Sequence, residues 1–300
     1  MEKLKSRSRS NRNFQIIIHI IFITLCAAVL YPFLLLVGVS FSTESDVVKY
    51  GYQLIPRNVT FEAYKQVFQN SESVVAAYRT TITYSVIGTF CTVLFDAMFA
   101  YPLTRKKLPG RMVFSFFLYF TMLFSGGTVP KYILNTRYLH LGNTIWIYIL
   151  PGMVSAYNIF MMRSFFQGLP EEMFESMRID GASHFNIFFK TVLPLSKPVL
   201  ATVAITVFLA KWNNWATAML YITDEELISL QYYLQRIMKN IQLLNSLSEQ
   251  GLGGVDLTEQ LPTETMRMAM AIVVAGPALF IFPFFQKYFV KGLTVGSVKG

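Results

Sequence analysis

The chain has 300 residues, of which 53% are hydrophobic and only 14% are charged, and its formal net charge is +9. Soluble domains usually carry about 25% charged residues, so this composition excludes an ordinary soluble domain and indicates a membrane protein. Cys26 and Cys91 both lie in apolar runs and the three histidines are scattered, so the sequence predicts neither a metal site nor a disulfide framework. Because no basic helix is interleaved with base-stacking aromatic residues, we expect no nucleic-acid partner.

Six apolar segments approach or exceed the length of about 20 residues that a helix needs to cross the hydrocarbon of a bilayer. The predicted spans are 14–39, 79–103, 112–129, 143–166, 198–221 and 267–289. The first span follows the stretch MEKLKSRSRSNRN, which is similar to the basic start of a signal peptide. Its apolar run is longer than the roughly 7–15 residues of a signal core and no A-x-A-like site follows it, so we interpret it as a retained helix.

Lys and Arg gather in alternate connecting segments. They are frequent in the N-terminal tail and after the second, fourth and sixth spans, whereas the other three loops are richer in Asp and Glu. Because Lys and Arg favour cytoplasmic loops, both termini are predicted to be cytoplasmic. The predicted fold class is an all-α membrane protein with six transmembrane helices. It forms a single transmembrane domain, 1–300, with a basic tail at 1–13, a six-helix core at 14–290 and a cytoplasmic tail at 291–300.

Two of the predicted outer loops are long. The loop 41–78 contains the amphipathic stretch FEAYKQVF, which predicts a short helix near the interface. The loop 222–266 contains NSLSEQGLGGVDL, whose Gly-rich polar composition is typical of a mobile connection. Both loops are either solvated connections or contact surfaces for an outer partner, since long loops are often functional.

The loop 167–197, between the fourth and fifth spans, carries the most distinctive pattern. Pro170 suits the first position of a helix, acidic residues follow it, and Gly181 suits a left-handed cap. The apolar side of this short helix is predicted to consist of Met173, Phe174 and Met177. A second short segment, 183–192, precedes LPLSKP, which returns the chain to the membrane. Taken alone, this pattern fits a plain interfacial helix equally well.

The same stretch resembles the EAA loop of ABC-importer permeases, whose pattern is roughly E-A-A-x-x-x-G followed by L-P. Glu175, Ser176 and Met177 stand at the E-A-A positions, so two alanines of the pattern are replaced while the spacing from Glu to Gly is kept. The stretch 180–182 reads D-G-A, as in sugar importers, and 193–194 reads L-P.

Other phrases extend this resemblance over nearly the whole chain. They are AYPLTR at 100–105, FSGGTVPKYIL at 124–134, YNIFMMRSFF at 157–166 and KGLTVGSVKG at 291–300. Together they are similar to the second permease subunit of maltose-type importers, above all to the Gram-positive branch that handles oligosaccharides and polysaccharide fragments. The resemblance implies the type I ABC importer fold and a place in the bacterial cytoplasmic membrane.

The resemblance also implies the partners. They are a second homologous permease subunit, two ABC ATPase subunits, an extracellular substrate-binding protein and an oligosaccharide substrate. The sequence has no G-x-x-x-x-G-K-[ST] phosphate loop, so ATP and Mg²⁺ are expected on the ATPase and no cofactor on this chain. The tail 291–300 is expected to reach the ATPase dimer interface. The residues implied in coupling to the ATPase are Glu172, Glu175, Asp180, Gly181, Ala182 and Pro194.

Polar residues inside the predicted spans are candidates for the substrate pathway. Lys211, Asn214 and Trp215 share a helical face by their spacing, and an aromatic ring beside polar donors suits a sugar. Tyr157 and Asn158 are weaker candidates of the same kind. An interfacial aromatic belt or hydrogen bonding between helices would explain these residues equally well. Asp96 lies at a different depth from Lys211, so a direct salt bridge between them needs a tilted or broken helix.

Three alternatives remain open from the sequence. The first is a permease of the same superfamily for a non-sugar solute, the second is a non-ABC receptor with six spans, and the third is an intramembrane enzyme. A receptor would need a cytoplasmic signalling domain, and an enzyme would need paired reactive residues at one depth; we recognise neither in the sequence. We therefore expect a transport subunit without enzymatic activity.

Overall fold

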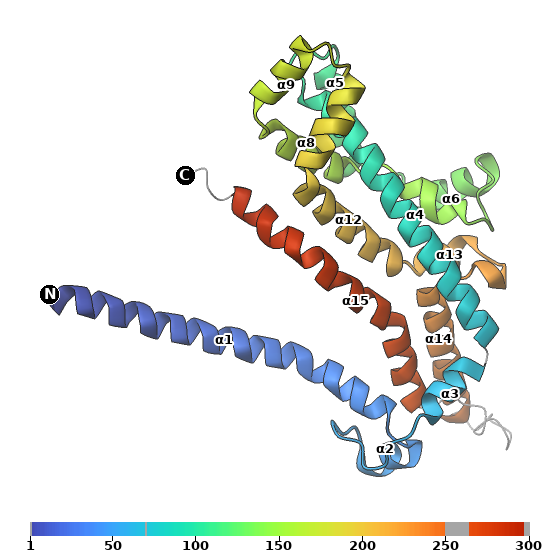
Figure 1. Ribbon diagram of the computed structural model, residues 1–300. Helices are drawn as coiled ribbons and strands as arrows, with labels where there is room; N and C mark the ends of the chain where they lie inside the picture. The colour runs from blue at the N-terminus through green and yellow to red at the C-terminus, as the bar shows by residue number, and fades with distance from the viewer. Residues whose placement is uncertain (1, 70, 250–263, 297–300) are drawn as a thin grey trace. The chain divides into compact units, whose positions relative to one another are not determined.

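The computed structural model describes residues 2–69, 71–249 and 264–296, which form helices joined by irregular segments (Figure 1). Within these ranges the β pairing is confined to an isolated bridge between Ser42 and Val59. The chain divides into two compact units. One comprises 1–71 and 237–274, and the other comprises 72–236 and 275–300.

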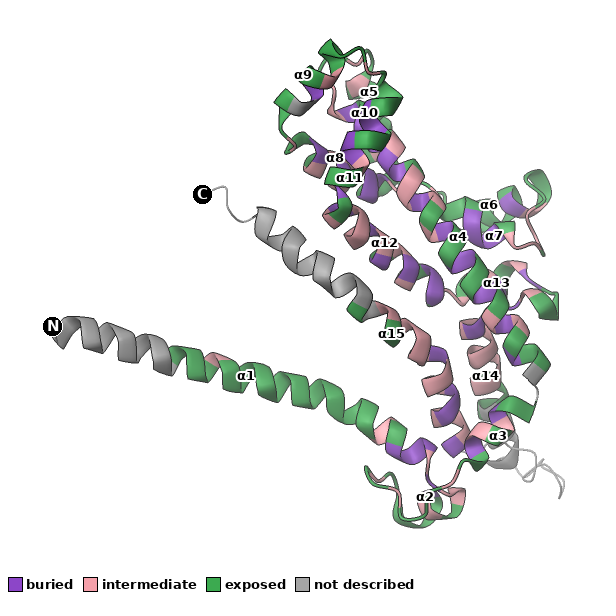
Figure 2. Cartoon of the chain, viewed as in Figure 1, coloured by how far each residue is buried: buried purple, intermediate pink, exposed green. Residues whose placement is uncertain are grey.

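The first unit contains three helices from the start of the chain. They are α1 (Glu2–Ser40), α2 (Glu44–Tyr50) and α3 (Glu62–Gln69). It also contains the end of α14 (Leu230–Glu249) and the start of α15 (Glu264–Gly296). Helix α3 confirms the short helix predicted from FEAYKQVF. The apolar part of α1, Phe14–Ser40, buries none of its most hydrophobic stretch against the rest of the chain (Figure 2).

Glu44 joins α2 to the start of α15 within the first unit. Its Oε1 accepts a hydrogen bond from the backbone N–H of Glu264 at 3.1 Å, and its Oε2 accepts from the backbone N–H of Thr265 at 3.0 Å. The first N–H groups of a helix have no partner inside the helix and favour negative charge. The carboxylate therefore caps α15 and anchors the segment that follows α1.

The second unit holds the remaining helices. From α4 to α8 they are α4 (Ser71–Thr104), α5 (Arg111–Leu123), α6 (Thr128–Ile133), the π-helix η1 (Leu134–Tyr138), α7 (Trp146–Ile149), the 3₁₀ turn η2 (Leu150–Gly152) and α8 (Ala156–Gln167). They continue with α9 (Glu171–Ile179), α10 (His184–Ile187), the π-helix η3 (Phe188–Val192), α11 (Leu193–Leu195), α12 (Lys197–Trp212), α13 (Ala216–Tyr221) and the 3₁₀ turn η4 (Glu225–Leu227), before the chain enters α14.

Two clusters of buried apolar side chains hold this unit together. One cluster joins α4, α8 and α12 to the segment that contains α9, α10 and η3, and Ile159, Met162 and Val203 are fully buried in it. The other joins α4 to α7 and α13, and it centres on Tyr84, whose ring stacks on that of Tyr148 with centroids 4.3 Å apart. This aromatic stacking stabilises the second cluster beyond the burial of apolar area. Because residues of α4 belong to both clusters, α4 supports both of them.

The structure confirms three of the predicted spans as helices long and apolar enough to cross a membrane. These are Phe14–Ser40, Glu72–Thr104 and Glu264–Ile281. Two more segments qualify only as bent pairs, Arg111–Leu123 with Thr128–Tyr138 at 112° and His184–Leu195 with Lys197–Trp212 at 79°. Helix α5 therefore ends before residue 129, the predicted end of the third span, and α12 ends before residue 221, the predicted end of the fifth.

Two of the interruptions have a local cause in the sequence. Helix α5 ends where Ser125, Gly126 and Gly127 follow, and Gly127 has a φ of +85°, which a residue with a side chain rarely adopts. The predicted fourth span is divided into α7, η2 and α8 at Pro151 and Gly152, because proline supplies no N–H and glycine weakens a helix.

The loop predicted at 222–266 is largely helical in its described part. Helix α14 covers Leu230–Glu249, so this part of the predicted loop is regular, whereas the Gly-rich part of NSLSEQGLGGVDL lies in 250–263, outside the described residues. Helix α15 continues to Gly296, which includes most of the predicted C-terminal tail, whereas 297–300 lie outside the described residues.

Candidate functional site

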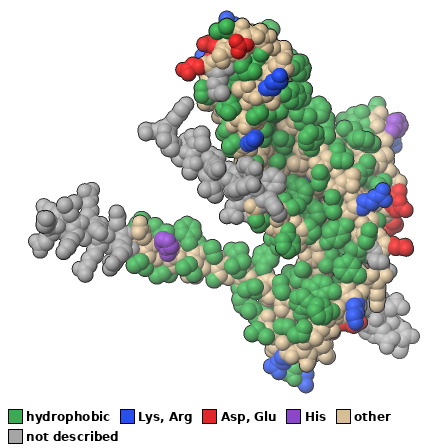
Figure 3. Space-filling view, in the orientation of Figure 1, with side chains coloured by type: hydrophobic (Ala, Val, Ile, Leu, Met, Phe, Trp, Pro, Cys, Tyr) green, Lys and Arg blue, Asp and Glu red, His purple; other side chains and the backbone are tan. Residues whose placement is uncertain are grey.

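The helix predicted in the loop after α8 is present as α9, and it begins at Glu171 with Pro170 as its N-cap residue. Its first turn carries Glu171 and Glu172, where the helix dipole favours negative charge. Acidic side chains gather on the surface over this helix (Figure 3). α9 therefore presents an anionic end to its surroundings.

Gly181 ends α9 in the left-handed conformation that the sequence predicts, with a φ of +75°. The backbone N–H of Ala182 donates to the carbonyl of Met177 at 2.9 Å, and the N–H of Gly181 donates to that of Arg178 at 3.1 Å. These two bonds are the pair that defines a Schellman cap. A Cβ at position 181 would meet nothing within 4 Å, so the backbone conformation alone favours glycine there.

The residues of α9 divide into a side that is buried in the chain's own core and a side that is exposed. Phe174 is only 5% exposed and packs in the buried cluster with α4 and α8. Met177 also packs against that cluster, and its sulfur accepts a hydrogen bond from the Thr191 hydroxyl at 2.8 Å. Phe174 and Met177 of the predicted apolar side therefore face the chain's own core, and the side chain of Met173 lies outside the described part of the structure. The exposed side carries Glu172, Glu175 and Ile179, and the last of these is 86% exposed.

The segment after the cap returns the chain to the membrane helices. The Ser183 hydroxyl caps α10 by accepting from the backbone N–H of Asn186 at 3.3 Å. Ala182 is partly buried against the core cluster, and Pro194 lies in α11 just before the bend into α12. Asp180 is exposed at the C-cap of α9. The structure therefore places all six predicted coupling residues in one short segment.

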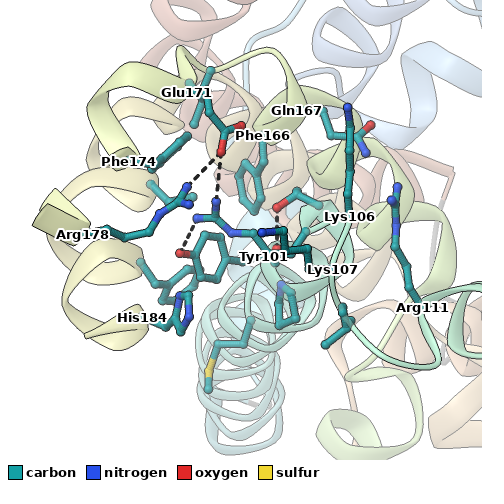
Figure 4. Close-up of a pocket in the computed structure, with 18 of the residues that line it drawn as sticks. Tyr101, Lys106, Lys107, Arg111, Phe166, Gln167, Glu171, Phe174, Arg178 and His184 are labelled. Carbon is teal, nitrogen blue, oxygen red and sulfur yellow. Dashed lines mark hydrogen bonds and ion pairs between the residues drawn. The ribbon is translucent and has the colours of Figure 1, made fainter. Parts of the chain in front are cut away.

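A cavity of about 1330 Å³ lies between this segment and the end of α4 (Figure 4). Aromatic side chains, among them Tyr101, Phe166 and Phe188, form its apolar lining. Cationic side chains from the segment after α4 line it as well, together with Glu171 and Glu175. Those cations are Arg105, Lys106, Lys107 and Arg111.

Arg105 is the cation of this segment that reaches α9. Its Nη2 donates to the Tyr101 hydroxyl at 2.7 Å, and its Nη1 lies 3.7 Å from the Glu171 carboxylate. Sequence reasoning missed this residue as part of the site, although the phrase AYPLTR ends on it. Its position directly after a span suggested only a topology signal.

The predicted shared face of Lys211, Asn214 and Trp215 is not formed, because α12 ends at Trp212 and α13 begins at Ala216. The Asn214 side chain instead caps α13, with its Oδ1 accepting from the backbone N–H of Thr217 at 3.1 Å. Trp215 is half-buried in the break between the two helices.

Lys211 is buried, with 9% of its surface exposed, and its Nζ donates to the backbone carbonyl of Tyr148 at 3.1 Å. Its side chain passes Gly88 on α4 so closely that a Cβ at position 88 would lie 2.8 Å from the Lys211 Cε. The carbonyl it contacts belongs to α7, next to the interruption of the predicted fourth span. The ammonium is therefore occupied by the chain's own backbone.

Asp96 lies on α4, fully buried, and has no contact with Lys211. Its Oδ1 accepts from the backbone N–H of Ser155 at 2.8 Å, and its Oδ2 accepts from the Asn158 side-chain amide at 2.9 Å. Ser155 is the N-cap residue of α8, so the carboxylate fixes the start of that helix. Asn158 is thereby buried, whereas its neighbour Tyr157 is 62% exposed.

Known proteins resemble this chain over most of its length. It is 34% identical over 295 residues, 97% of this chain and 99% of the relative, to the "Polygalacturonan/rhamnogalacturonan transport system permease protein YtcP" of Bacillus subtilis (strain 168). It is 28% identical over 274 residues, 90% of this chain and 91% of the relative, to the "Arabinooligosaccharides transport system permease protein AraQ" of Halalkalibacterium halodurans.

A solved structure shares the fold. A chain from the "Crystal structure of a bacterial ABC transporter involved in the import of the acidic polysaccharide alginate" superposes with a TM-score of 0.79 at 29% identity, covering 94% of this chain and 98% of the other. The family model described as "Binding-protein-dependent transport system inner membrane component" matches residues 77–295. The chain therefore belongs to the family of binding-protein-dependent transport system inner membrane components.

Proposed function

We propose that this chain is the permease subunit of an ATP-driven importer for oligosaccharides in the bacterial cytoplasmic membrane. The observation that carries the proposal is α9, a short acid-rich helix between two spans that is closed by a Schellman cap and exposes Glu172, Glu175 and Ile179. We call it the coupling helix. The substrate class is supported by the names of two relatives, which refer to the transport of polygalacturonan/rhamnogalacturonan and of arabinooligosaccharides.

The proposed assembly contains a second homologous permease, two ATPase subunits and an extracellular substrate-binding protein. ATP and Mg²⁺ belong to the ATPase, and this chain performs no chemistry. The chain crosses the membrane six times with both termini in the cytoplasm, so the bent and broken pairs each serve as one crossing. Irregular backbone at membrane depth is tolerated where it is buried in protein or lines a water-filled cavity. The C-terminal tail extends toward the ATPase dimer.

The docking role of the coupling helix is tested by changing its exposed side. Glu175→Lys and Ile179→Asp are each expected to reduce co-purification of the ATPase and uptake by at least about tenfold, because like-charge or charge-to-apolar contact at a desolvated interface costs more than about 1.4 kcal/mol. The measurements are pull-down of the ATPase from detergent-solubilised membranes and uptake of labelled oligosaccharide.

Glu62→Lys is the matched control, since Glu62 is an exposed glutamate in the first turn of α3. We expect this variant to dock and transport normally. Normal docking and uptake by both α9 variants would refute the coupling-helix assignment.

We propose that the substrate passes the break between α12 and α13. Interrupted helices in transporters commonly form the binding site at mid-membrane, because the freed backbone groups and nearby side chains face the path. Trp215 and Asn214 lie in this break, and Tyr157 is exposed on α8. Lys211 and Asn158 do not contact the substrate in this proposal. They stabilise the helices beside the path, since each is buried and hydrogen-bonded to the chain's own polar groups.

Trp215→Ala is expected to reduce uptake about fivefold or more without loss of assembly, because a sugar ring would lose an aromatic contact worth about 1 kcal/mol or more. Uptake and substrate-stimulated ATP hydrolysis are measured together. Trp146→Ala is the control, since Trp146 is an exposed tryptophan on α7. Equal behaviour of the two variants would remove Trp215 from the path.

A further inference from the structure

Three consecutive cations follow α4, but they do not behave alike. Lys106 and Lys107 are exposed, as expected of residues that only set the orientation in the membrane. The Arg105 side chain is only 21% exposed, and its Nη1 lies 3.7 Å from the carboxylate of Glu171, the first residue of the coupling helix. This difference needs a local explanation, because all three residues serve the topology equally well.

On the α4 side, Arg105 is attached to a buried residue. Tyr101 lies in the last turn of α4, 7% exposed, and its hydroxyl accepts the 2.7 Å hydrogen bond from Nη2. The guanidinium carbon also lies 4.9 Å from the centre of the Tyr101 ring. A guanidinium group can stack on a ring and donate hydrogen bonds at the same time, which the compact ammonium of lysine cannot.

On the α9 side, the same guanidinium contacts two residues. Its carbon lies 5.1 Å from the centre of the Phe174 ring, and its Nη1 lies 3.7 Å from the Glu171 carboxylate. Glu171 also accepts a 2.9 Å hydrogen bond from Arg178, at the other end of the helix. The Glu171 side chain is 68% exposed, so its ion pairs contribute little by themselves. The two rings and the Tyr101 hydroxyl are therefore the firmer contacts.

We propose that Arg105 is a positioning residue that fixes the angle of the coupling helix against the end of α4. The inference rests on the proposed function, since it concerns how α9 acts once an ATPase is docked on it. Movement imposed on α9 then passes through Phe174, Arg105 and Tyr101 into α4, the helix that supports both buried clusters of its unit. Without Arg105, the ATPase still docks on the exposed side of α9, but its movement reaches α4 less completely.

The test compares three variants in the assembled transporter. Arg105→Gln removes the charge and the stacking plane, Tyr101→Phe removes only the hydroxyl, and Lys106→Gln is the neighbouring cation control. The readouts are ATPase co-purification, uptake per ATP hydrolysed, and amide hydrogen exchange of residues 171–179.

We expect Arg105→Gln to keep the ATPase, to lower uptake per ATP about tenfold, which corresponds to about 1.4 kcal/mol, and to speed exchange in α9 severalfold. Tyr101→Phe should show the same changes at smaller size. Lys106→Gln should match the wild type. Arg105→Lys should not restore uptake per ATP hydrolysed to the wild-type value, because lysine keeps the charge but lacks the planar guanidinium group that stacks on the rings.

Two results would overturn the inference. One is an unchanged ratio and unchanged exchange in both Arg105→Gln and Tyr101→Phe. The other is loss of the ATPase from Arg105→Gln, which would make Arg105 a docking residue or a residue needed for folding. A failure of the proposed function has a different signature, since Glu175→Lys would then retain the ATPase and transport normally.

Discussion

Replacing Gly181 by valine is expected to abolish uptake while the chain still inserts in the membrane. Gly181 has a φ of +75°, and left-handed backbone costs about 1–2 kcal/mol for a residue with a Cβ and more for a β-branched one. The backbone would escape this strain by giving up the cap bonds from Ala182 and Gly181, and α9 would then change its end and its angle. The measurements are membrane abundance, ATPase co-purification and uptake.

Two controls separate strain from position. Gly181→Asn should retain most of the uptake, because asparagine tolerates the left-handed region. Gly51→Val introduces at least as much strain in the segment after α2, because Gly51 has a φ of +74° and a ψ of −170°, a region that is essentially restricted to glycine, with equally open space around the Cβ. We expect that variant to transport far better than Gly181→Val. Similar uptake by the two would mean that strain anywhere, rather than the cap of α9, causes the loss.

Asp96→Ala is expected to lower the amount of folded protein in the membrane severely. The substitution leaves the Ser155 N–H and the Asn158 amide buried without their acceptor, and each orphaned group costs about 1–3 kcal/mol. The start of α8 would also lose its anchor on α4. Membrane abundance and the apparent melting temperature of the purified assembly measure the effect.

Asn158→Ala separates the contributions of the two hydrogen bonds to stability. It removes one of the two hydrogen bonds and leaves the bond from Ser155 to Asp96 in place, so its loss of stability should be clearly smaller. Asp96→Asn keeps one acceptor oxygen and should also fall between wild type and Asp96→Ala. Wild-type abundance and melting temperature of Asp96→Ala would show that the carboxylate is dispensable for the fold.

The sequence was sufficient for the features that depend on local chemistry. Pro170, the acids after it and Gly181 predicted a capped helix, and α9 has the predicted start within one residue and the predicted end. Runs of apolar residues located the spans of α1, α4 and α15, because hydropathy alone decides whether a helix can cross lipid.

Tertiary contacts decided what the sequence could not. The order of Met173, Phe174 and Met177 indicates an apolar side, but it does not say whether a partner or the chain's own core receives Phe174. The breaks after Trp212 and before Ala156 were read as continuous helix, because long apolar segments conceal them and side chains elsewhere satisfy the freed backbone. Tyr84 donates to the carbonyl of Lys211, and Lys211 donates to that of Tyr148.

The missed helix α14 had a readable signal. Its sequence LQYYLQRIMKNIQLLNSLSE has apolar residues at helical spacing, but the Gly-rich stretch after it suggested a loop throughout. Arg105 had no such signal. Its role follows from the ring of Phe174, which lies far along the chain and meets the guanidinium only in the folded unit.

The contact between Gly88 and Lys211 restricts how this protein can change over generations. A side chain at position 88 would require the end of the Lys211 side chain to shift, which would disturb its hydrogen bond to the carbonyl of Tyr148. Substitutions at the two positions are therefore expected to depend on each other. A methyl group at position 88 should be tolerated best together with a shorter side chain at position 211 and another donor for the carbonyl of Tyr148.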